Sequence, residues 1–209
     1  MAAETLTIAV LGAGNIGGTV GRKWVSAGHR VVFGVNDPNG KNAQALRSTL
    51  GDSADIGTVD TALSSHPDVV FMALPGTVMD AIIKQYAAQL DGRIIIDATN
   101  KMGRSSMNSF AELQQHTPHA RIYRAFNSYG YENFANPTFD DIQADLFFCG
   151  TDGDSRATIE QLISAVGLRP VYLGGVEQVN TVDGVASIWF ALVFGQHKSR
   201  HLAFKMLER

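Results

Sequence analysis

The feature that most constrains the fold is a glycine-rich segment close to the start of the chain. Gly12, Gly14 and Gly17 follow the GxGxxG spacing. The apolar residues 6–11 precede this segment and are typical of a buried strand, whereas residues 15–27 repeat apolar side chains every four positions, as on one face of a helix. A strand, a glycine turn and an amphipathic helix in this order predict a dinucleotide-binding unit.

Each glycine of the motif has a mechanical reason for its position. Gly12 permits the tight turn after the strand, Gly14 lets the backbone approach a pyrophosphate, and Gly17 lets the helix pack closely on the strand. The N–H groups in the first helical turn, together with the helix dipole, then hold the phosphates. We therefore predict that the chain binds NAD or NADP.

Strands and helices alternate along the rest of the chain. Strands are predicted at residues 6–11, 30–34, 54–58, 68–74, 93–97, 121–126, 145–150 and 170–173. Helices are predicted at residues 15–27, 41–50, 78–86, 159–166 and 178–209. This alternation predicts an α/β fold, a Rossmann-type doubly wound and mainly parallel sheet, in a single domain over residues 1–209.

The closing segment, residues 178–209, is predicted to be a helical extension of that domain. Residues 185–194 within it are apolar on nearly every side, and such a helix must be covered all round. Two coverings fit the pattern equally well, the core of the same chain or a second subunit. From this segment we expect a homodimer.

Composition and charge narrow the class of protein. The 209 residues are 45% hydrophobic and 18% charged, which is typical of a globular domain, and the net charge of -3 without a basic stripe argues against nucleic acid as a partner. No signal peptide is visible and the run at residues 6–11 is too short to span a bilayer, so we expect a soluble, cytoplasmic protein without a membrane partner. The single cysteine, Cys149, lies in an apolar run and is expected to be inert filling.

The end of the second predicted strand should distinguish NAD from NADP. An acidic residue there binds the ribose hydroxyls, whereas an arginine accommodates the 2′-phosphate. The sequence offers Val35, Asn36 and Asp37 before Pro38. Asn36 can face either group, Asp37 fits a turn better than a ribose contact, and Lys41 is within reach of a phosphate, so both cofactors remain open.

Several short motifs, in a specific order, connect this chain to a known family. They are Gly-Asn-Ile-Gly at 14–17, Gly-His at 28–29, Phe-Gly at 33–34, Ala-Leu-Pro at 73–75, Asp-Ala-Thr-Asn at 97–100, Ala-Phe-Asn at 125–127 and Gly-Leu-Arg-Pro at 167–170. With these motifs the chain resembles the NADPH-dependent coenzyme F420 (deazaflavin) oxidoreductases. The wider family includes the cytoplasmic domains of membrane ferric reductases.

The resemblance implies hydride transfer, with the dinucleotide bound across the carboxyl ends of the strands. It assigns Ala13, Gly14, Asn15 and Ile16 to the pyrophosphate, Asn36 to the adenosine ribose, Ala73, Leu74 and Pro75 to the nicotinamide, and Asn100 and Phe126 to its vicinity. A flavin or coenzyme F420 would be the second substrate. It would stack on the nicotinamide under the C-terminal helix near Leu207.

Two departures from the family pattern affect this expectation. Val35-Asn36 stand where NADP-specific relatives carry an arginine, often after a serine, which weakens the case for NADP. Gly76 stands where the deazaflavin enzymes often carry an aromatic residue, which leaves the second substrate open.

No catalytic residue is assigned from the sequence, because hydride transfer between two rings needs orientation rather than a proton donor. Reduction of a small carbonyl or imine would need a donor, for which Lys101, Lys198 or His197 is available. His197 and His201 are spaced to share a face of the last helix, but no third ligand accompanies them, so no metal site is predicted. Too few residues remain for the long helical domain of hydroxyacid dehydrogenases. A dinucleotide-sensing regulator without turnover is the remaining alternative.

Overall fold

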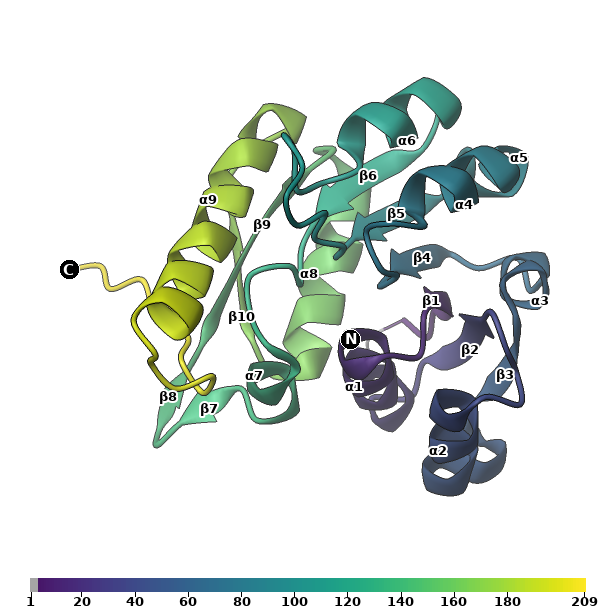
Figure 1. Cartoon of the computed structure of the whole chain (residues 1–209), viewed down its shortest axis with the longest axis horizontal. Helices are drawn as coiled ribbons and strands as arrows, with labels where there is room; N and C mark the ends of the chain where they lie inside the picture. The colour runs from purple at the N-terminus through teal and green to yellow at the C-terminus, as the bar shows by residue number, and fades with distance from the viewer. Residues whose placement is uncertain (1–3) are drawn as a thin grey trace.

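The computed structural model describes residues 4–209, in which strands and helices alternate (Figure 1). The strands are β1 (Thr7–Leu11), β2 (Arg30–Val35), β3 (Asp55–Thr58), β4 (Val69–Met72), β5 (Ile94–Asp97), β6 (Arg121–Arg124), β7 (Thr138–Phe139), β8 (Ile142–Gln143), β9 (Asp145–Gly150) and β10 (Arg169–Tyr172). The helices are α1 (Asn15–Ser26), α2 (Lys41–Leu50), α3 (Val59–Ser64), α4 (Met79–Gln85), α5 (Ala87–Leu90), α6 (Phe110–His116), α7 (Tyr131–Ala135), α8 (Asp154–Val166) and α9 (Val179–Phe190).

Eight of the strands form one sheet in the order β10-β9-β6-β5-β4-β1-β2-β3. The neighbours from β6 to β3 pair in parallel, whereas β9 runs antiparallel to β6 and parallel to β10. The predicted Rossmann-type, mainly parallel sheet is therefore confirmed. The strand order reverses at β1, because β2 and β3 lie on one side of it and β4 to β6 on the other. Open α/β sheets bind ligands at such a reversal, beyond the carboxyl ends of the strands.

Both faces of the sheet are covered, which explains why β1 is apolar after Thr7. Ile8 and Val10 belong to the core cluster that contains Trp24 of α1, whereas Ala9 and Leu11 belong to the cluster under α3, α4 and α6. The Trp24 side chain lies fully buried, and its indole nitrogen donates a hydrogen bond of 2.9 Å to a backbone carbonyl of α8. The first helix therefore joins the two ends of the sheet.

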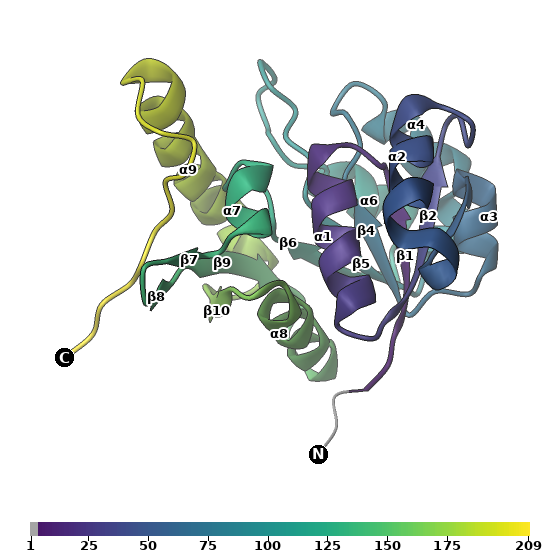
Figure 2. The same cartoon turned by 90° about the horizontal axis from the view of Figure 1, so that it is seen from below.

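The C-terminal third of the chain extends the sheet beyond β6. Helices α8 and α9 lie on opposite sides of β9 and β10, as Figures 1 and 2 show from two directions. Between residues 4 and 209, none of the helices combines the length and the apolar character that crossing a bilayer requires.

The prediction of a helix to the end of the chain is wrong beyond Gly195. After α9, one π-helical stretch, Ala191–Gly195, closes the helix, and His197 has a φ of +52°. Tertiary contacts explain the ending. The Trp189 indole donates a hydrogen bond of 2.7 Å to the Leu202 carbonyl oxygen. The backbone N–H of Asp145 donates one of 3.0 Å to the carbonyl oxygen of Phe204. The tail thus packs as an extended segment, and the carbonyl groups of a continued helix could not make these contacts.

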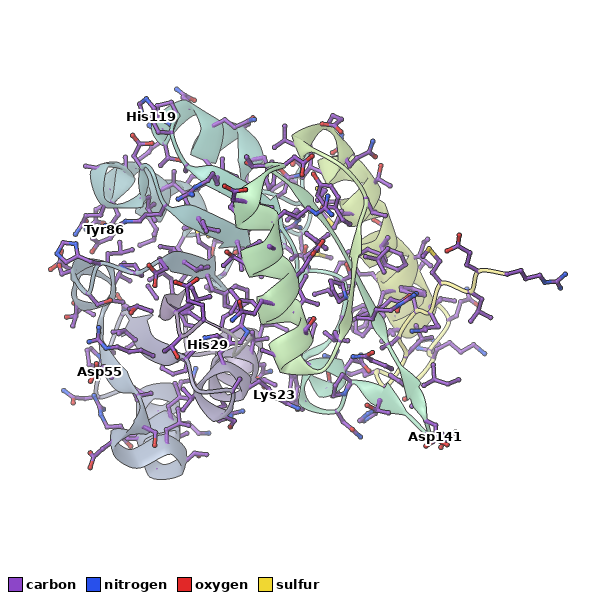
Figure 3. The ribbon with its side chains drawn as sticks, turned by 180° about the vertical axis from the view of Figure 1, so that it is seen from behind. Lys23, His29, Asp55, Tyr86, His119 and Asp141 are labelled. Carbon is purple, nitrogen blue, oxygen red and sulfur yellow. The ribbon has the colours of Figure 1, made fainter. Side chains whose placement is uncertain are left out.

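Several short elements have no counterpart in the prediction. Helices α6 and α7 have seven and five residues, and β7 and β8 form a two-stranded hairpin with two residues in each strand. Elements of this length contain too few residues for a periodic pattern. Asp141 lies at the tip of the hairpin, at the far side of the molecule from His119 (Figure 3).

Candidate functional site

A cavity lies where the strand order reverses. It has a volume of about 520 Å³, and we call it the main groove. Its walls come from the segments that follow β1, β2 and β4. They are Gly12, Ala13, Gly14, Asn15, Ile16, Val35, Asn36, Asp37, Gly40, Lys41, Asn42, Ala43, Ala73, Leu74 and Pro75. Eleven of the residues proposed from the sequence to hold the dinucleotide therefore meet in one groove.

The glycine turn has the geometry that a dinucleotide requires. Gly12 has a φ of +105°, and a Cβ on it would lie 2.4 Å from the carbonyl oxygen of Ala73. A Cβ on Gly17 would lie 2.0 Å from the carbonyl oxygen of Gly12, so the helix touches the turn there. A Cβ on Gly14, in contrast, would meet no atom within 4 Å, and no side chain caps the start of α1. The space beside Gly14 and the helix N-terminus fit a pyrophosphate.

The wall after β2 carries the residues that would meet the adenosine ribose. Asp37 Oδ1 accepts a hydrogen bond of 2.9 Å from the backbone N–H of Asn39, so the Asp37 carboxylate sets the turn, as the sequence analysis favoured. Asn36 and Lys41 are exposed along the groove. These two side chains, rather than an arginine, are available to a 2′-phosphate.

Beyond Pro75 the groove continues into two further cavities. The inner hollow, of about 180 Å³, is lined by Pro75, Gly76, Thr77, Asn100, Lys101, Met102 and Arg104. The outer hollow, of about 260 Å³, is lined by Gly76, Thr77, Asp80, Lys101, Arg104, Ser105, Ser106, Asn108, Ser109, Ala111 and Glu112.

The glycine that departs from the family pattern is explained by this arrangement. A Cβ on Gly76 would lie 2.8 Å from the Cα of Lys101 and 3.0 Å from the carbonyl oxygen of Asn100. The backbone after β5 therefore occupies the space that an aromatic side chain at position 76 would need. The shape of the site next to Gly76 is accordingly set by the segment after β5.

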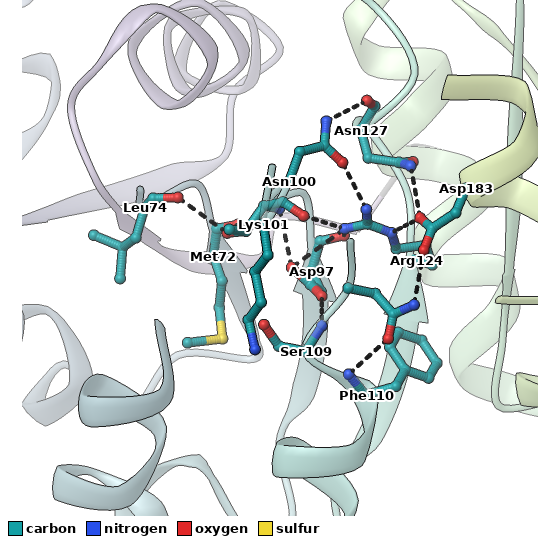
Figure 4. Close-up of polar contacts among 12 residues, drawn as sticks. Met72, Leu74, Asp97, Asn100, Lys101, Ser109, Phe110, Arg124, Asn127 and Asp183 are labelled. Carbon is teal, nitrogen blue, oxygen red and sulfur yellow. Dashed lines mark hydrogen bonds and ion pairs between the residues drawn. The ribbon is translucent and has the colours of Figure 1, made fainter. Parts of the chain in front are cut away.

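A buried arginine fixes that segment (Figure 4). Arg124, at the end of β6, has no exposed surface. Its Nε donates a hydrogen bond of 2.8 Å to Oδ1 of Asp183 on α9. Its Nη1 donates two hydrogen bonds, of 2.6 Å to the carbonyl oxygen of Thr99 and of 3.1 Å to that of Asp97. Its Nη2 donates 2.7 Å to Oδ1 of Asn100. One guanidinium thus joins β6, the end of β5 and the last long helix.

Further hydrogen bonds extend this network toward the main groove. Asn108 and Asn127 donate to the Asp183 carboxylate at 2.7 and 3.2 Å. The Thr99 hydroxyl lies 3.2 Å from the carbonyl oxygen of Leu74, a residue of the groove wall. A continuous path of polar contacts therefore runs from α9 across the carboxyl ends of three strands.

Asp97 supports the same segment from below. Its two carboxylate oxygens accept hydrogen bonds from the backbone N–H groups of Thr99 (2.9 Å) and Ser109 (2.7 Å), and Oδ1 lies 3.4 Å from Arg124 Nη1. Burial raises the pKa of Asp97 above the usual carboxyl range, while the Arg124 charge and the two N–H groups oppose this shift. Since both oxygens are occupied within the fold, Asp97 organises the loop and does not face a substrate.

Other predicted site residues lie elsewhere. Gly17 packs beneath the groove, and Asn100 lines the inner hollow. The side chain of Phe126, which the resemblance places close to the nicotinamide, is buried, with its ring 5.8 Å from that of Trp24 and 5.4 Å from that of Phe71. Its φ of +61° turns the ring into the core.

The C-terminal residues named from the sequence do not reach the site. His197 and His201 are exposed and lie beyond the last helix, so they share no helical face. Leu207 is 87% exposed on the extended tail and caps no cavity. Cys149 is buried, and burial raises the pKa of its thiol to about 12, which fits the expected inert filling.

Sequence reasoning missed the charged network and the polar hollows. Arg124 ends a four-residue strand that also contains Arg121, and its partner Asp183 follows 59 positions later. The one available signal was the cluster of polar residues at 97–109 after a buried strand, since strand ends of a parallel sheet meet at one edge.

Comparison with known proteins agrees with this geometry. Residues 7–101 match the family described as NADP oxidoreductase, coenzyme F420-dependent. The chain is 25% identical over 187 residues to the metalloreductase STEAP3 of Rattus norvegicus, which covers 87% of this chain and 36% of STEAP3. It is 22% identical to the F420-dependent NADP reductase of Methanocaldococcus jannaschii, over 73% of this chain and 74% of that protein.

The fold comparison covers more of the molecule. The crystal structure of a putative F420-dependent NADP reductase from an Arthrobacter species superposes with a TM-score of 0.82 at 17% identity, over 97% of this chain and 100% of that one. In contrast, the chain spans only about a third of the length of STEAP3. The chain therefore resembles the F420-dependent NADP oxidoreductase family, by sequence in its nucleotide-binding half and by fold over nearly its whole length.

Proposed function

We propose that this chain is an NAD(P)-dependent oxidoreductase that transfers hydride between a nicotinamide and a flavin- or deazaflavin-like partner. The observation that supports this most is the continuity of the site. The main groove contains the glycine turn that a dinucleotide needs. It meets the inner hollow at Pro75, and the inner hollow shares lining residues with the outer one. A second molecule placed there would meet the first ring to ring.

The residues of this chain contribute position and exclusion of water. A bound nicotinamide would supply the hydride. The segment after β4, with Ala73, Leu74 and Pro75, forms the wall at that end of the groove. The segment after β5 is held against it by the Arg124 network. Two rings fixed at contact distance need no side-chain acid, because orientation is the main catalytic contribution in such a transfer.

We propose NADPH as the preferred dinucleotide, with NADH accepted more weakly. Asn36 can donate a hydrogen bond to a 2′-phosphate, and Lys41 adds a positive charge on the same wall. Calorimetric titration with NADPH and, separately, with NADH tests this preference. Tighter binding of NADH would instead assign the ribose to Asp37.

Hydride transfer is tested by anaerobic NADPH oxidation with flavins and a deazaflavin as acceptors. We expect turnover with at least one ring acceptor. Tight NADPH binding without turnover of any ring acceptor would contradict the proposal and favour a dinucleotide-sensing regulator.

A second candidate function is the reduction of a small carbonyl or imine. It is favoured by Lys101, whose side chain is only 12% exposed and lines both hollows. This function predicts oxidation of NADPH by small carbonyl compounds, and a loss of that activity in Lys101→Met. The absence of turnover with a panel of such compounds would exclude it.

We also propose a homodimer through α9. The side chains of Ile188 on α9 and of Phe194 in the π-helical stretch after it are each 55% exposed, while Trp189 and Val193 are buried. A paired helix would cover the exposed apolar side chains. Sedimentation of the wild-type chain and of Ile188→Glu tests this, since the substitution should yield monomers. A monomeric wild type would contradict it.

A further inference from the structure

The hollows beyond Pro75 differ from the main groove in the chemistry of their walls. The main groove is walled mostly by backbone and small or apolar side chains, and Lys41 is its one cationic residue. The inner and outer hollows share two basic side chains, Lys101 and Arg104. The proposed function needs only a flat surface for the second ring, so it leaves these charges unexplained.

The charge of the inner hollow is entirely positive. Its seven lining residues include Lys101 and Arg104 and no carboxylate. The Lys101 ammonium is held 2.5 Å from Asp80 Oδ1, and the Asp80 side chain, 51% exposed, belongs to the outer hollow. Within residues 4–209, the guanidinium of Arg104 makes no hydrogen bond or ion pair. One cation is thus fixed in position beside the strand end, and a second one is available.

A buried hydroxyl group in the same place also needs a partner. Ser109 lines the outer hollow and is 1% exposed, and its Oγ is one of three buried side-chain polar atoms without a hydrogen bond in the described chain. A buried hydroxyl that lacks a partner is costly. The Ser109 backbone is already fixed, because its N–H donates to Asp97. Ser109 therefore brings to the outer hollow a hydroxyl group for which the described chain supplies no partner.

We infer that the hydride acceptor of this chain carries a phosphate group, which Lys101 and Arg104 bind in the hollows beyond Pro75. The hydroxyl groups of Thr77 and Ser109 add hydrogen-bond donors on the same side. A phosphate offers several acceptor oxygens and a charge of about −2, which matches two cations and two hydroxyl groups. The carboxylates of Asp80 and Glu112 line only the outer hollow, as Ser109 does, so we place the phosphate where the two hollows meet, beside Thr77, Lys101 and Arg104. This inference rests on the proposed function and narrows its acceptor to a phosphorylated ring compound.

FMN and riboflavin test the inference, because they share one ring system and differ in the phosphate. The affinity of the chain, saturated with oxidised dinucleotide, is measured for each by quenching of flavin fluorescence. Initial rates of NADPH oxidation are measured for each under anaerobic conditions. We expect FMN to bind at least about tenfold more tightly than riboflavin, and inorganic phosphate to compete with FMN alone.

Variants then locate the effect. Arg104→Gln and Lys101→Met should each lower the ratio of FMN to riboflavin affinity by about tenfold, and their affinity for NADPH should match that of the wild type. Ser109→Ala should lower the same ratio about threefold without loss of thermal stability, because it removes an unpartnered hydroxyl. Lys84→Met is the matched control, since Lys84 is exposed on neighbouring α4, pairs with Glu112 and lines none of these cavities.

The outcomes separate this inference from the proposed function. Equal affinities for FMN and riboflavin, with both reduced, would leave the proposed function standing and overturn the phosphate site. An FMN preference that persists in the Lys101→Met, Arg104→Gln double variant would also overturn it. If neither flavin bound or was reduced while NADPH bound tightly, the flavin-type function would fail and the inference with it.

Discussion

Helices and loops pack on the strands at both sides of the sheet, but the contacts differ between the β1–β3 side and the β6–β10 side. On the β1–β3 side, glycines let backbone segments approach closely, as between Gly17 and Gly12. On the β6–β10 side, buried ion pairs connect the segments. Arg124 pairs with Asp97 and Asp183, and Asp145 pairs with Arg169 and Lys205. Glycine contacts place backbone beside a ligand, whereas charged contacts hold segments that are distant in sequence.

The largest effect is expected from the centre of the charged side. Arg124→Met leaves Asp97 and Asp183 buried without their cation, and breaking a buried ion pair of this kind costs about 3–5 kcal/mol. Urea unfolding should show that loss. The matched control is Arg121→Met on the same strand, whose exposed side chain bonds only the Gly92 carbonyl oxygen and should cost under about 1 kcal/mol. Similar losses for the two variants would show that the network adds no stability.

The glycine side is tested by a pair of substitutions in one motif. Gly17→Ala places a methyl group 2.0 Å from the Gly12 carbonyl oxygen, and should lower the free energy of unfolding by about 3 kcal/mol. Gly14→Ala meets no protein atom within 4 Å, so it should unfold like the wild type and still bind the dinucleotide more weakly, because its methyl group faces the groove. Chemical denaturation and calorimetry check both. Equal stability losses would contradict this division between packing and ligand approach.

The same contrast explains what could be predicted from the sequence. The glycine turn and the residues after β1, β2 and β4 follow local rules of spacing and strand ends, so the main groove was predictable. Arg124 and Asp183 were not, because they lie 59 positions apart and nothing local marks the pairing. Phe126 and the residues after Gly195 depart from local preference, because their aromatic rings and carbonyl groups find tertiary partners.

A smaller and pH-dependent effect is expected where the tail joins the charged side. The Asp145 side chain is fully buried, which opposes its ionisation, but hydrogen bonds from Arg169, the Met206 N–H and Lys205 outweigh this and lower its pKa. A carboxyl group with a lowered folded pKa stabilises the fold above its unfolded pKa of about 4, and this contribution is lost as the pH falls through the folded value.

The substitution Asp145→Asn isolates that contribution. At neutral pH it should lower the free energy of unfolding by about 1.5 kcal/mol, which is the contribution of one hydrogen bond to a charged group. The difference from wild type should shrink as the pH falls below about 4. Asp141→Asn at the exposed hairpin tip is the control and should show no such dependence. A difference that is constant from neutral to acidic pH would mean that packing, and not charge, explains the loss.

The smallest effect belongs to the one cation of the main groove. If Lys41 contacts the 2′-phosphate, Lys41→Gln should weaken NADPH binding about threefold, the size of an exposed ion pair, and leave NADH binding unchanged. Lys23→Gln, in the last turn of α1, is the control, because Lys23 lines none of these three cavities. Calorimetry with both dinucleotides measures the ratio. An equal loss for NADH would place Lys41 at a group that the two cofactors share. The β1–β3 side would then select its ligand through backbone alone, and Asn36 would be the remaining side chain to distinguish NADP from NAD.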